Sequence, residues 1–414
     1  MQTPDTSPAP ADRYAAFRHR PYFLFWVARF VASFAVQIVA VSVAWQVYDI
    51  TRDPFYLGLV GILQFAPSLL LVLVTGAASD RFGRRMIMAV CIAVETICAL
   101  LMLYFTIEGF HSVTPIFATL VLMGTARAFF GPAASSLAAN VVPKEDFGNA
   151  VSWSSSAWQI ASIVGPVAGG LLYGVSPVVA YSVAAVMLAV SCLCVIQIPK
   201  PAQHDRSGTN MLENIMGGFN YIYREKIVLG AVSLDMFAVL LGGAVALLPV
   251  YARDILVLGP WGLGLLRAAP GVGAVAVALW LAGHPIRNHA GFILFIAVAL
   301  FGLFTTIFGV STVPWLSIGA LALLGAADGI SVYIREVLIQ LWTPDELRGR
   351  VNAVNMVFVG ASNELGEFRA GMMASGFGAV PAVVFGGVAS IAVAGLWAAG
   401  FPALRNAKSL SGAN

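Results

Sequence analysis

Long apolar stretches alternate with short polar segments between residues 22 and 402. A helix needs about 20 apolar residues to cross the hydrocarbon core of a bilayer. Because lipid offers no hydrogen-bond partners, each stretch must satisfy its backbone internally and is predicted to be a helix. Twelve stretches of this length follow one another along the chain: 22–48, 55–79, 86–107, 113–139, 148–173, 177–198, 227–252, 260–282, 290–310, 313–341, 348–375 and 380–402.

The composition is that of a membrane protein and excludes a soluble globular one. Of the 414 residues, 59% are hydrophobic and 10% are charged, whereas soluble domains carry about 25% charged residues. The four cysteines fall within the stretches and lack the spacing of a metal site. We therefore predict an all-α protein of twelve transmembrane helices, without metal or cofactor.

Basic residues fall almost entirely on one side of the predicted helices. The loops of the other side hold only Arg52 and Arg253. Because cytoplasmic loops carry the excess of lysine and arginine, we predict a multi-pass protein of a bacterial inner membrane with both termini in the cytoplasm. The basic side holds Arg13, Arg18, Arg20, Arg81, Arg84, Arg85, Lys144, Lys200, Arg206, Arg224, Lys226, Arg287, Arg348, Arg350, Arg405 and Lys408.

A polar segment in the middle of the chain separates six predicted helices from six. The predicted units are a cytoplasmic tail 1–21, an N-terminal bundle 22–198, a cytoplasmic linker 199–226, a C-terminal bundle 227–402 and a cytoplasmic tail 403–414.

The two bundles carry an internal repeat. Residues 61–67 match residues 264–270, with glycine first and proline last in both. An even number of helices per unit gives both bundles the same orientation, so the repeat is parallel, and substrate is expected near the midplane between bundles that rock about it. At one further constant offset, Gly124, Pro143, Glu145, Gly165 and Gly170 correspond to Gly325, Pro344, Glu346, Gly366 and Gly371.

A charged turn follows the second predicted helix, with the spacing G-x-x-x-D-R-x-G-R-R over residues 76–85. This spacing resembles the loop signature of the Major Facilitator Superfamily between its second and third helices. In that family the loop stabilises the outward-facing state. The alternative is a basic turn that only fixes topology. The resemblance implies a cytoplasmic gate made of Gly76, Asp80, Arg81, Gly83, Arg84 and Arg85.

The fifth predicted helix contains a run of small residues from Ala161 to Gly170. The run is similar to the G-x-x-x-G-P-x-x-G-G motif of antiporters in the same superfamily, with Ala161 in place of the first glycine. The resemblance favours export, and helix packing without a direction is the alternative. The residues assigned to this packing motif are Gly165, Pro166, Gly169 and Gly170.

Charged residues within the predicted helices are candidates for function. A charge at the bilayer centre costs several kcal/mol and normally faces the bundle interior. Structural ion pairs are the alternative. We expect Arg127 and Asp328 to lie opposite each other, because they fall at repeat-related places. The candidates for the substrate cavity are Arg29, Arg127, Arg267, Arg335, Glu336, Asn363, Glu364 and Glu367.

Three acids within the predicted helices are candidates for proton coupling. A carboxylate held out of water can take up and release a proton near neutral pH. The three are Glu95, Asp235 and Asp328.

The polar patch from Gly360 to Arg369, together with Asp235, resembles the branch of the superfamily that holds enterobactin-type siderophore exporters and secretion proteins. The resemblance implies a proton-coupled exporter of an amphipathic small molecule, a siderophore or drug, acting by alternating access. The alternatives are a lipid or lysophospholipid flippase and a non-transporting sensor or scaffold. The expected partners are the substrate, protons and the bilayer, with no nucleic acid. We expect a monomer, and no nucleotide loop or catalytic cluster indicates an enzyme.

Asp80 is expected at the N-terminal end of the eleventh helix, where the helix dipole is positive. Arg84 and Arg85 are expected to pair with Glu145 or Asp146. Replacing Asp80 by asparagine should therefore lower transport and leave expression intact, because the closed cytoplasmic side loses a contact. Flux and cysteine accessibility measure this, and a variant that transports like the wild type would contradict the gate.

Overall fold

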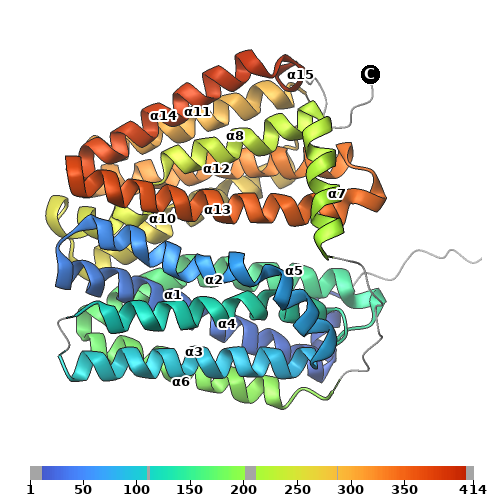
Figure 1. Ribbon diagram of the computed structural model, residues 1–414, viewed down its shortest axis with the longest axis vertical. Helices are drawn as coiled ribbons and strands as arrows, with labels where there is room; N and C mark the ends of the chain where they lie inside the picture. The colour runs from blue at the N-terminus through green and yellow to red at the C-terminus, as the bar shows by residue number, and fades with distance from the viewer. Residues whose placement is uncertain (1–11, 110–111, 201–210, 287, 407–414) are drawn as a thin grey trace, which may run out of the picture.

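The computed structural model describes residues 12–109, 112–200, 211–286 and 288–406, and the secondary structure in these ranges is entirely helical. Figure 1 shows two bundles of long helices lying side by side. The first bundle contains α1 (Arg20–Thr51), α2 (Pro54–Arg81), α3 (Arg84–Ile107), α4 (Thr114–Ala138), α5 (Phe147–Val175) and α6 (Pro177–Ile196). The second contains α8 (Lys226–Gly242), α10 (Gly259–Gly283), α11 (Ala290–Val310), α12 (Pro314–Trp342), α13 (Asp345–Phe377) and α14 (Ala379–Gly400).

Two ends of the molecule are distinguished below. The near end is where α1 and α8 begin, and the far end is where α1 ends. Short elements complete the chain: η1 (Ala15–Arg18), η2 (Lys144–Asp146), α7 (Met211–Arg224), η3 (Val245–Leu247), α9 (Leu248–Val250), η4 (Tyr251–Ile255) and α15 (Pro402–Arg405).

Eleven segments of the described chain are long and apolar enough to cross a membrane. The remaining predicted span, 348–375, corresponds to α13, which is too polar to qualify by composition. Its 33 residues give a length of about 50 Å, and it packs against α2, α8 and α14 inside the assembly. Tertiary packing therefore keeps this polar helix among the apolar ones.

Helix boundaries follow local sequence signals. Ser176 caps α6, because its hydroxyl accepts a hydrogen bond from the amide of Val178 at 3.2 Å, and Pro177 follows at the first helical position. At the other end of a span, Arg52 terminates α1 in a left-handed conformation with φ of 53°. Such signals set short turns between neighbouring antiparallel helices.

The predicted seventh span, 227–252, is not one continuous helix. Helix α8 ends at Gly242, and η3, α9 and the π-helix η4 complete the segment. A methyl group added at Gly243 would lie 2.8 Å from the carbonyl carbon of Gly366, so the backbones of the two segments nearly touch. Glycine permits this approach and interrupts the helix.

The predicted linker 199–226 contains a helix that the sequence pattern did not indicate. Helix α7 runs across the direction of the long helices and packs against α13 (Figure 1). Gly218 lies against the backbone of Arg350, and the hydroxyl of Tyr221 donates to the carbonyl of Trp342. This part of the linker is therefore docked on the second bundle.

The bundles meet through repeat-related glycines. A methyl group added at Gly170 of α5 would lie 2.5 Å from the carbonyl oxygen of Pro260 in α10. At its repeat partner, Gly371 of α13, an added methyl group would lie 2.8 Å from the carbonyl oxygen of Pro54 in α2. The contacts α5–α10 and α2–α13 are thus equivalent under the internal two-fold relation. Both lie toward the far end, where they close the bundles against each other.

Replacing Gly170 by alanine should push α5 away from α10, because the added methyl meets the backbone of Pro260. Overpacking of this kind costs about 1–3 kcal/mol. The distance between spin labels on the exposed residues Val175 and Trp261 should lengthen. Gly174 is the matched control, since nothing lies within 4 Å of a methyl group there. Equal distances in both alanine variants would show that the α5–α10 contact does not hold the far end closed.

Candidate functional site

Three cavities follow one another along the inner side of the first bundle. The outer cavity has a volume of about 620 Å³ and lies at the near end, beside Phe147 at the start of α5. The middle cavity and the inter-bundle cavity each measure about 170 Å³. Trp158 lines both the outer and the middle cavity, while Gln37 and Arg127 line both the middle and the inter-bundle cavity. The three spaces therefore form one series.

A single stripe of α1 lines this whole series. The stripe runs from residue 29 to residue 44, a rise of about 22 Å along the helix. Its spacing of three and four residues places the side chains on one face. The stripe contains Arg29, Ser33, Gln37, Ala40 and Ala44.

A cluster of three polar side chains lies where the middle and inter-bundle cavities meet. Nε of Arg127 on α4 lies 3.7 Å from Oε1 of Glu95 on α3. The same guanidinium donates from Nη1 to Oε1 of Gln64 on α2 at 3.2 Å. The Glu95 side chain is only 4% exposed, whereas that of Arg127 is 38% exposed to the cavities. One accessible cation thus connects a buried acid to the helix that contacts the second bundle.

The inter-bundle cavity is lined by charges from the second bundle. Glu364 and Glu367 lie one turn apart on α13, and Arg267 of α10 interacts electrostatically with both. Gly61 of α2 packs directly against the carboxylate of Glu364. The absence of a side chain at this position brings α2 close to the acidic patch of α13.

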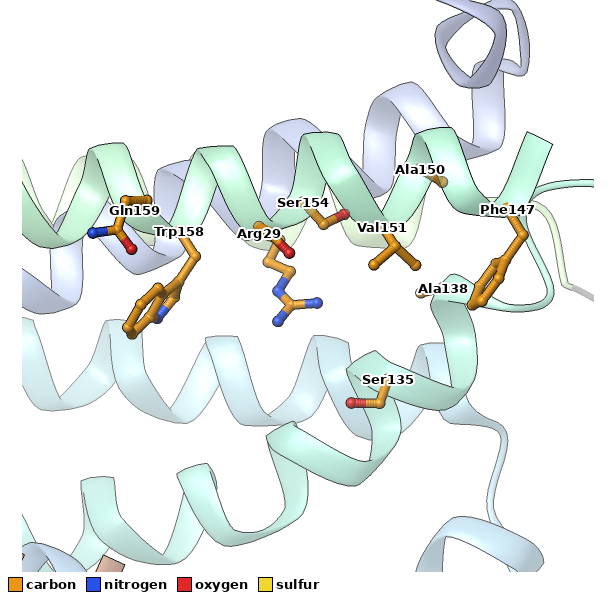
Figure 2. A pocket seen from close by; sticks show the side chains of 10 residues that line it. Arg29, Ser135, Ala138, Phe147, Ala150, Val151, Ser154, Trp158 and Gln159 are labelled. Atoms are coloured by element: carbon orange, nitrogen blue, oxygen red, sulfur yellow. The ribbon is translucent and has the colours of Figure 1, made fainter. Parts of the chain in front are cut away.

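Arg29 projects from α1 into the outer cavity. Figure 2 shows its guanidinium in the space between α5 and α4, with Trp158 beside it and Ser135 across from it. Within the described chain, it has no hydrogen bond and no ion pair. It interacts electrostatically with Tyr22, whose hydroxyl donates to the carbonyl of Ala150 at 2.8 Å.

A cluster of charged side chains bridges the bundles at the far end. We call Tyr48, Asp49, Arg52, Arg253 and Asp254 the far-end cluster. Arg253 pairs with Asp49, and Tyr48 donates to the carboxylate of Asp254. Nη1 of Arg52 lies 3.6 Å from Oδ1 of Asp254. The pairing is reciprocal, because each bundle contributes one acid and one arginine.

Comparison with known proteins identifies the family to which the chain belongs. A model of the family described as transmembrane secretion effector matches residues 11–411. The chain belongs to this family.

Relatives of the chain include proteins named as exporters. The enterobactin exporter EntS of Escherichia coli O1:K1 is 23% identical over 375 residues, covering 87% of this chain and 86% of the relative. EntS of Shigella boydii serotype 18 is 22% identical over 367 residues, with the same coverage.

Solved structures show that the fold is that of the Major Facilitator Superfamily. A POT family transporter in complex with 5-aminolevulinic acid superposes with a TM-score of 0.75 at 10% identity, covering 93% of this chain and 96% of that one. A bacterial homologue of the human lysosomal transporter Spinster, inward-facing and unoccupied, gives a TM-score of 0.67 at 14% identity, covering 96% and 97%. The chain shares the fold of these proteins. Together with the family match and the relatives, this makes it a multi-pass membrane transporter rather than an enzyme.

The structure gives two of the predicted charged residues partners that were not expected from the sequence. Arg127 contacts Glu95 and not Asp328, which has no cation or hydrogen-bond partner among the described residues. The internal repeat superposes one bundle on the other by a rotation. Two equivalent positions therefore lie in different bundles and need not be in contact. Asp235, a predicted proton-coupling candidate, forms a buried ion pair with Arg335.

Other substrate-cavity candidates have partners of their own or lie away from the cavities. Oε1 of Glu336 on α12 accepts from Asn355 on α13 at 3.3 Å. Asn363 is exposed on α13 and lines none of the three cavities. The Glu336–Asn355 bond and the Asp235–Arg335 pair both connect helices of the second bundle.

The charged turn makes different contacts from those expected. Gly83 precedes α3, Arg84 donates to the carbonyl of Ser136 at 3.4 Å, and Arg85 donates to that of Ile198 at 2.6 Å. Both arginines therefore tie α3 to the near ends of α4 and α6 within the first bundle. Asp146 pairs with His19 instead. Gly76, Asp80 and Arg81 belong to helix α2, but their side chains lie outside the described residues.

The glycine motif of α5 contacts two helices in different bundles. Gly165 and Gly169 face α1, where added methyl groups would lie 2.7 Å from Cβ of Gln37 and 3.0 Å from Cα of Ile38. Gly170 faces α10, and the carbonyl of Pro166 lies against Gly264. The motif brings α1 and α10 close to α5.

Gln64 and the far-end cluster were not among the residues predicted from the sequence. Gln64 occupies the same place in the repeated run 61–67 that Arg267 occupies in 264–270, and both line the inter-bundle cavity. The sequence could have indicated Gln64, because both copies of this repeated position hold a polar residue within an apolar stretch. For the far-end cluster, the signal was that Arg52 and Arg253 each have an acid within three residues.

Replacing Asp49 by asparagine should open the far end, because Arg253 loses its partner across the bundles. The probe is Ala44→Cys, which lines the inter-bundle cavity, in a background free of native cysteines. A membrane-impermeant thiol reagent, added on the side of the membrane that the far end faces, should label this cysteine several-fold faster than in the protein with Asp49. Glu108, an exposed acid at the same end with no bridging role, serves as control in Glu108→Gln. Equal labelling of the two variants would contradict a gate at the far-end cluster.

Proposed function

We propose that the protein exports an amphipathic small molecule across the bacterial inner membrane, by alternating access and in exchange for protons. The observation that carries this proposal is the Glu95–Arg127–Gln64 cluster at the junction of the cavities. Glu95 is a titratable acid, Arg127 is an accessible cation, and Gln64 lies on α2, the helix that contacts the second bundle. The enterobactin exporters among the relatives support a siderophore or similar compound as cargo.

The direction of opening follows from the distribution of charge. Basic residues concentrate at the near end, and the positive-inside rule assigns that end to the cytoplasm. The far end, with its glycine contacts and ion pairs, then faces the periplasm and is closed. A cavity series that begins at the near end suits an exporter in the state that takes up cargo from the cytoplasm.

Glu95 is the group that we assign to proton exchange. Its carboxylate accepts either a proton or a hydrogen-bond donor of the cargo, and the two compete for the same oxygens. Arg127 favours the ionised acid, and a bound proton weakens the Arg127–Glu95 attraction. Cargo bound from the cytoplasm and protons bound from the periplasm therefore occupy the site in alternation, which gives antiport.

Gln64 provides a route from this site to the bundle interface. It accepts from Arg127, and its backbone packs against Gly124 of α4. On the same helix, Gly61 and Gly58 contact α13. Movement of the Arg127 guanidinium upon protonation of Glu95 thus acts on the helix that closes the far end.

Replacing Glu95 by glutamine should abolish export against a concentration gradient and preserve downhill exchange, because the amide binds cargo but no proton. Proteoliposome flux with an imposed proton gradient measures both, beginning with enterobactin as cargo. Asp328→Asn is the matched control, since Asp328 lines none of the three cavities. Uphill export by Glu95→Gln would overturn the assignment, and wild-type liposomes that move no amphipathic compound would overturn the transport function.

Asp235 gives a contrasting outcome in the same assay. Asp235→Asn leaves Arg335 buried without its partner, and breaking a buried pair in this way costs about 3–5 kcal/mol. We expect loss of folded protein rather than uncoupled transport. Thermal unfolding in detergent separates the two effects, and a stable but uncoupled Asp235→Asn variant would move the proton site to the second bundle.

A further inference from the structure

We infer that the outer cavity is the entry site for cargo, and that Arg29 binds an anionic group on an aromatic, amphipathic molecule there. The inference rests on the proposed function for its place in transport, but the binding site itself stands on the geometry of α1, α4 and α5. It adds a chemical class of ligand to the cavity series.

Arg29 differs from the other arginines within the spans. Arg127 contacts Glu95, and Arg335 contacts Asp235. Arg369 donates to the carbonyl of Leu240 at 3.0 Å, and Arg267 lies in the field of two glutamates. Among the described residues, Arg29 alone of these five has neither an acid nor a hydrogen-bond acceptor. An anion can bind it without breaking a pair inside the protein.

The lining of the outer cavity selects for a particular ligand. Among the described residues that line it there is no acid, so none of them neutralises the charge of Arg29. The indole of Trp158 and the ring of Phe147 offer apolar surfaces, which suit an aromatic body. Ser135 and Ser154 offer hydroxyl groups on the two sides of the guanidinium, and Gln159 offers an amide beyond Trp158 (Figure 2).

The size and position of the cavity suit an entry site. Its volume of about 620 Å³ falls in the range of ligand pockets, about 300–1,000 Å³. Trp158 also lines the middle cavity, so an aromatic group in contact with it lies next to the Glu95–Arg127 pair. From Arg29 to Gln37 the stripe of α1 spans about 12 Å. A molecule of siderophore size can therefore reach the middle cavity while its anionic group still contacts Arg29.

The test uses purified full-length protein in lipid nanodiscs and two matched probes, 2-naphthoate and 2-naphthamide. They share one ring system and differ by a full negative charge. Wild-type protein should bind the anion at least tenfold more tightly than the amide in isothermal titration. Arg29→Gln should remove this preference, and Arg29→Lys should retain part of it.

Two further measurements distinguish binding from structural effects. Lys144→Gln removes an exposed positive charge near the start of α5 and should leave the preference unchanged. Thermal unfolding of Arg29→Gln should match the wild type, because Arg29 has no partner to lose among the described residues. A large drop in unfolding temperature, or an anion preference that survives in Arg29→Gln, would overturn the inference.

The outcomes also separate this inference from the proposed function. Wild-type protein that prefers naphthoate through Arg29 but carries no amphipathic compound across liposomes would refute transport and leave the anion site standing. Protein that exports cargo but binds both probes equally would refute the anion site and leave transport standing.

Discussion

The cost of placing charge inside a membrane governs the arrangement of this protein. A charged side chain within a span is costly unless it is paired, hydrogen-bonded or open to an internal cavity. The Asp235–Arg335 pair meets the requirement by full burial and holds α8 to α12. Glu95 and Arg127 meet it in part, with a buried acid and an accessible base. Arg29 meets it only through the outer cavity. Among the described residues, the charged groups thus range from a fully buried ion pair to an unpaired cation that is open to a cavity.

The two kinds of contact between the bundles differ in how easily they break. The glycine contacts of α5–α10 and α2–α13 bring backbones together over several residues and need no charge. The far-end ion pairs are partly exposed: the side chains of Arg52 and Asp254 are 54% and 41% exposed, and those of Arg253 and Asp49 are 22% and 47% exposed. Surface pairs of this kind contribute about 0–1 kcal/mol each, so breaking one of them costs little free energy. Packing therefore sets the orientation of the closed state, and weak pairs adjust its lifetime.

Much of the fold was accessible from the sequence, because apolar length and the internal repeat are local properties. Eleven predicted spans qualify by length and composition, and α13 is the predicted helix of the eleventh stretch. Helix α7 was missed because its segment looked polar overall, and the break after α8 was missed because hydropathy does not detect a backbone contact such as Gly243 with Gly366.

The candidate site could be predicted less well, because its ion pairs and hydrogen bonds join helices whose relative orientation the sequence alone does not give. The types and depths of Arg127 and Glu95 were evident, but their contact depends on how α3 and α4 rotate against each other. The repeat suggested Asp328 as the partner of Arg127, although rotation carries equivalent positions to separate places. The outer cavity around Arg29 depends on the spacing of three helices, which no single segment encodes.

The polarity of α13 has a consequence for how the protein is made. With Glu364, Glu367 and Arg369 near its middle, this segment would incur a cost of about 2.5–3.5 kcal/mol for such a residue at the centre of an isolated inserting helix. Its partners α2 and α8 precede it in the chain, and they supply contacts for the polar face. Stable insertion of α13 into the bilayer therefore depends on contacts with helices that are synthesised before it.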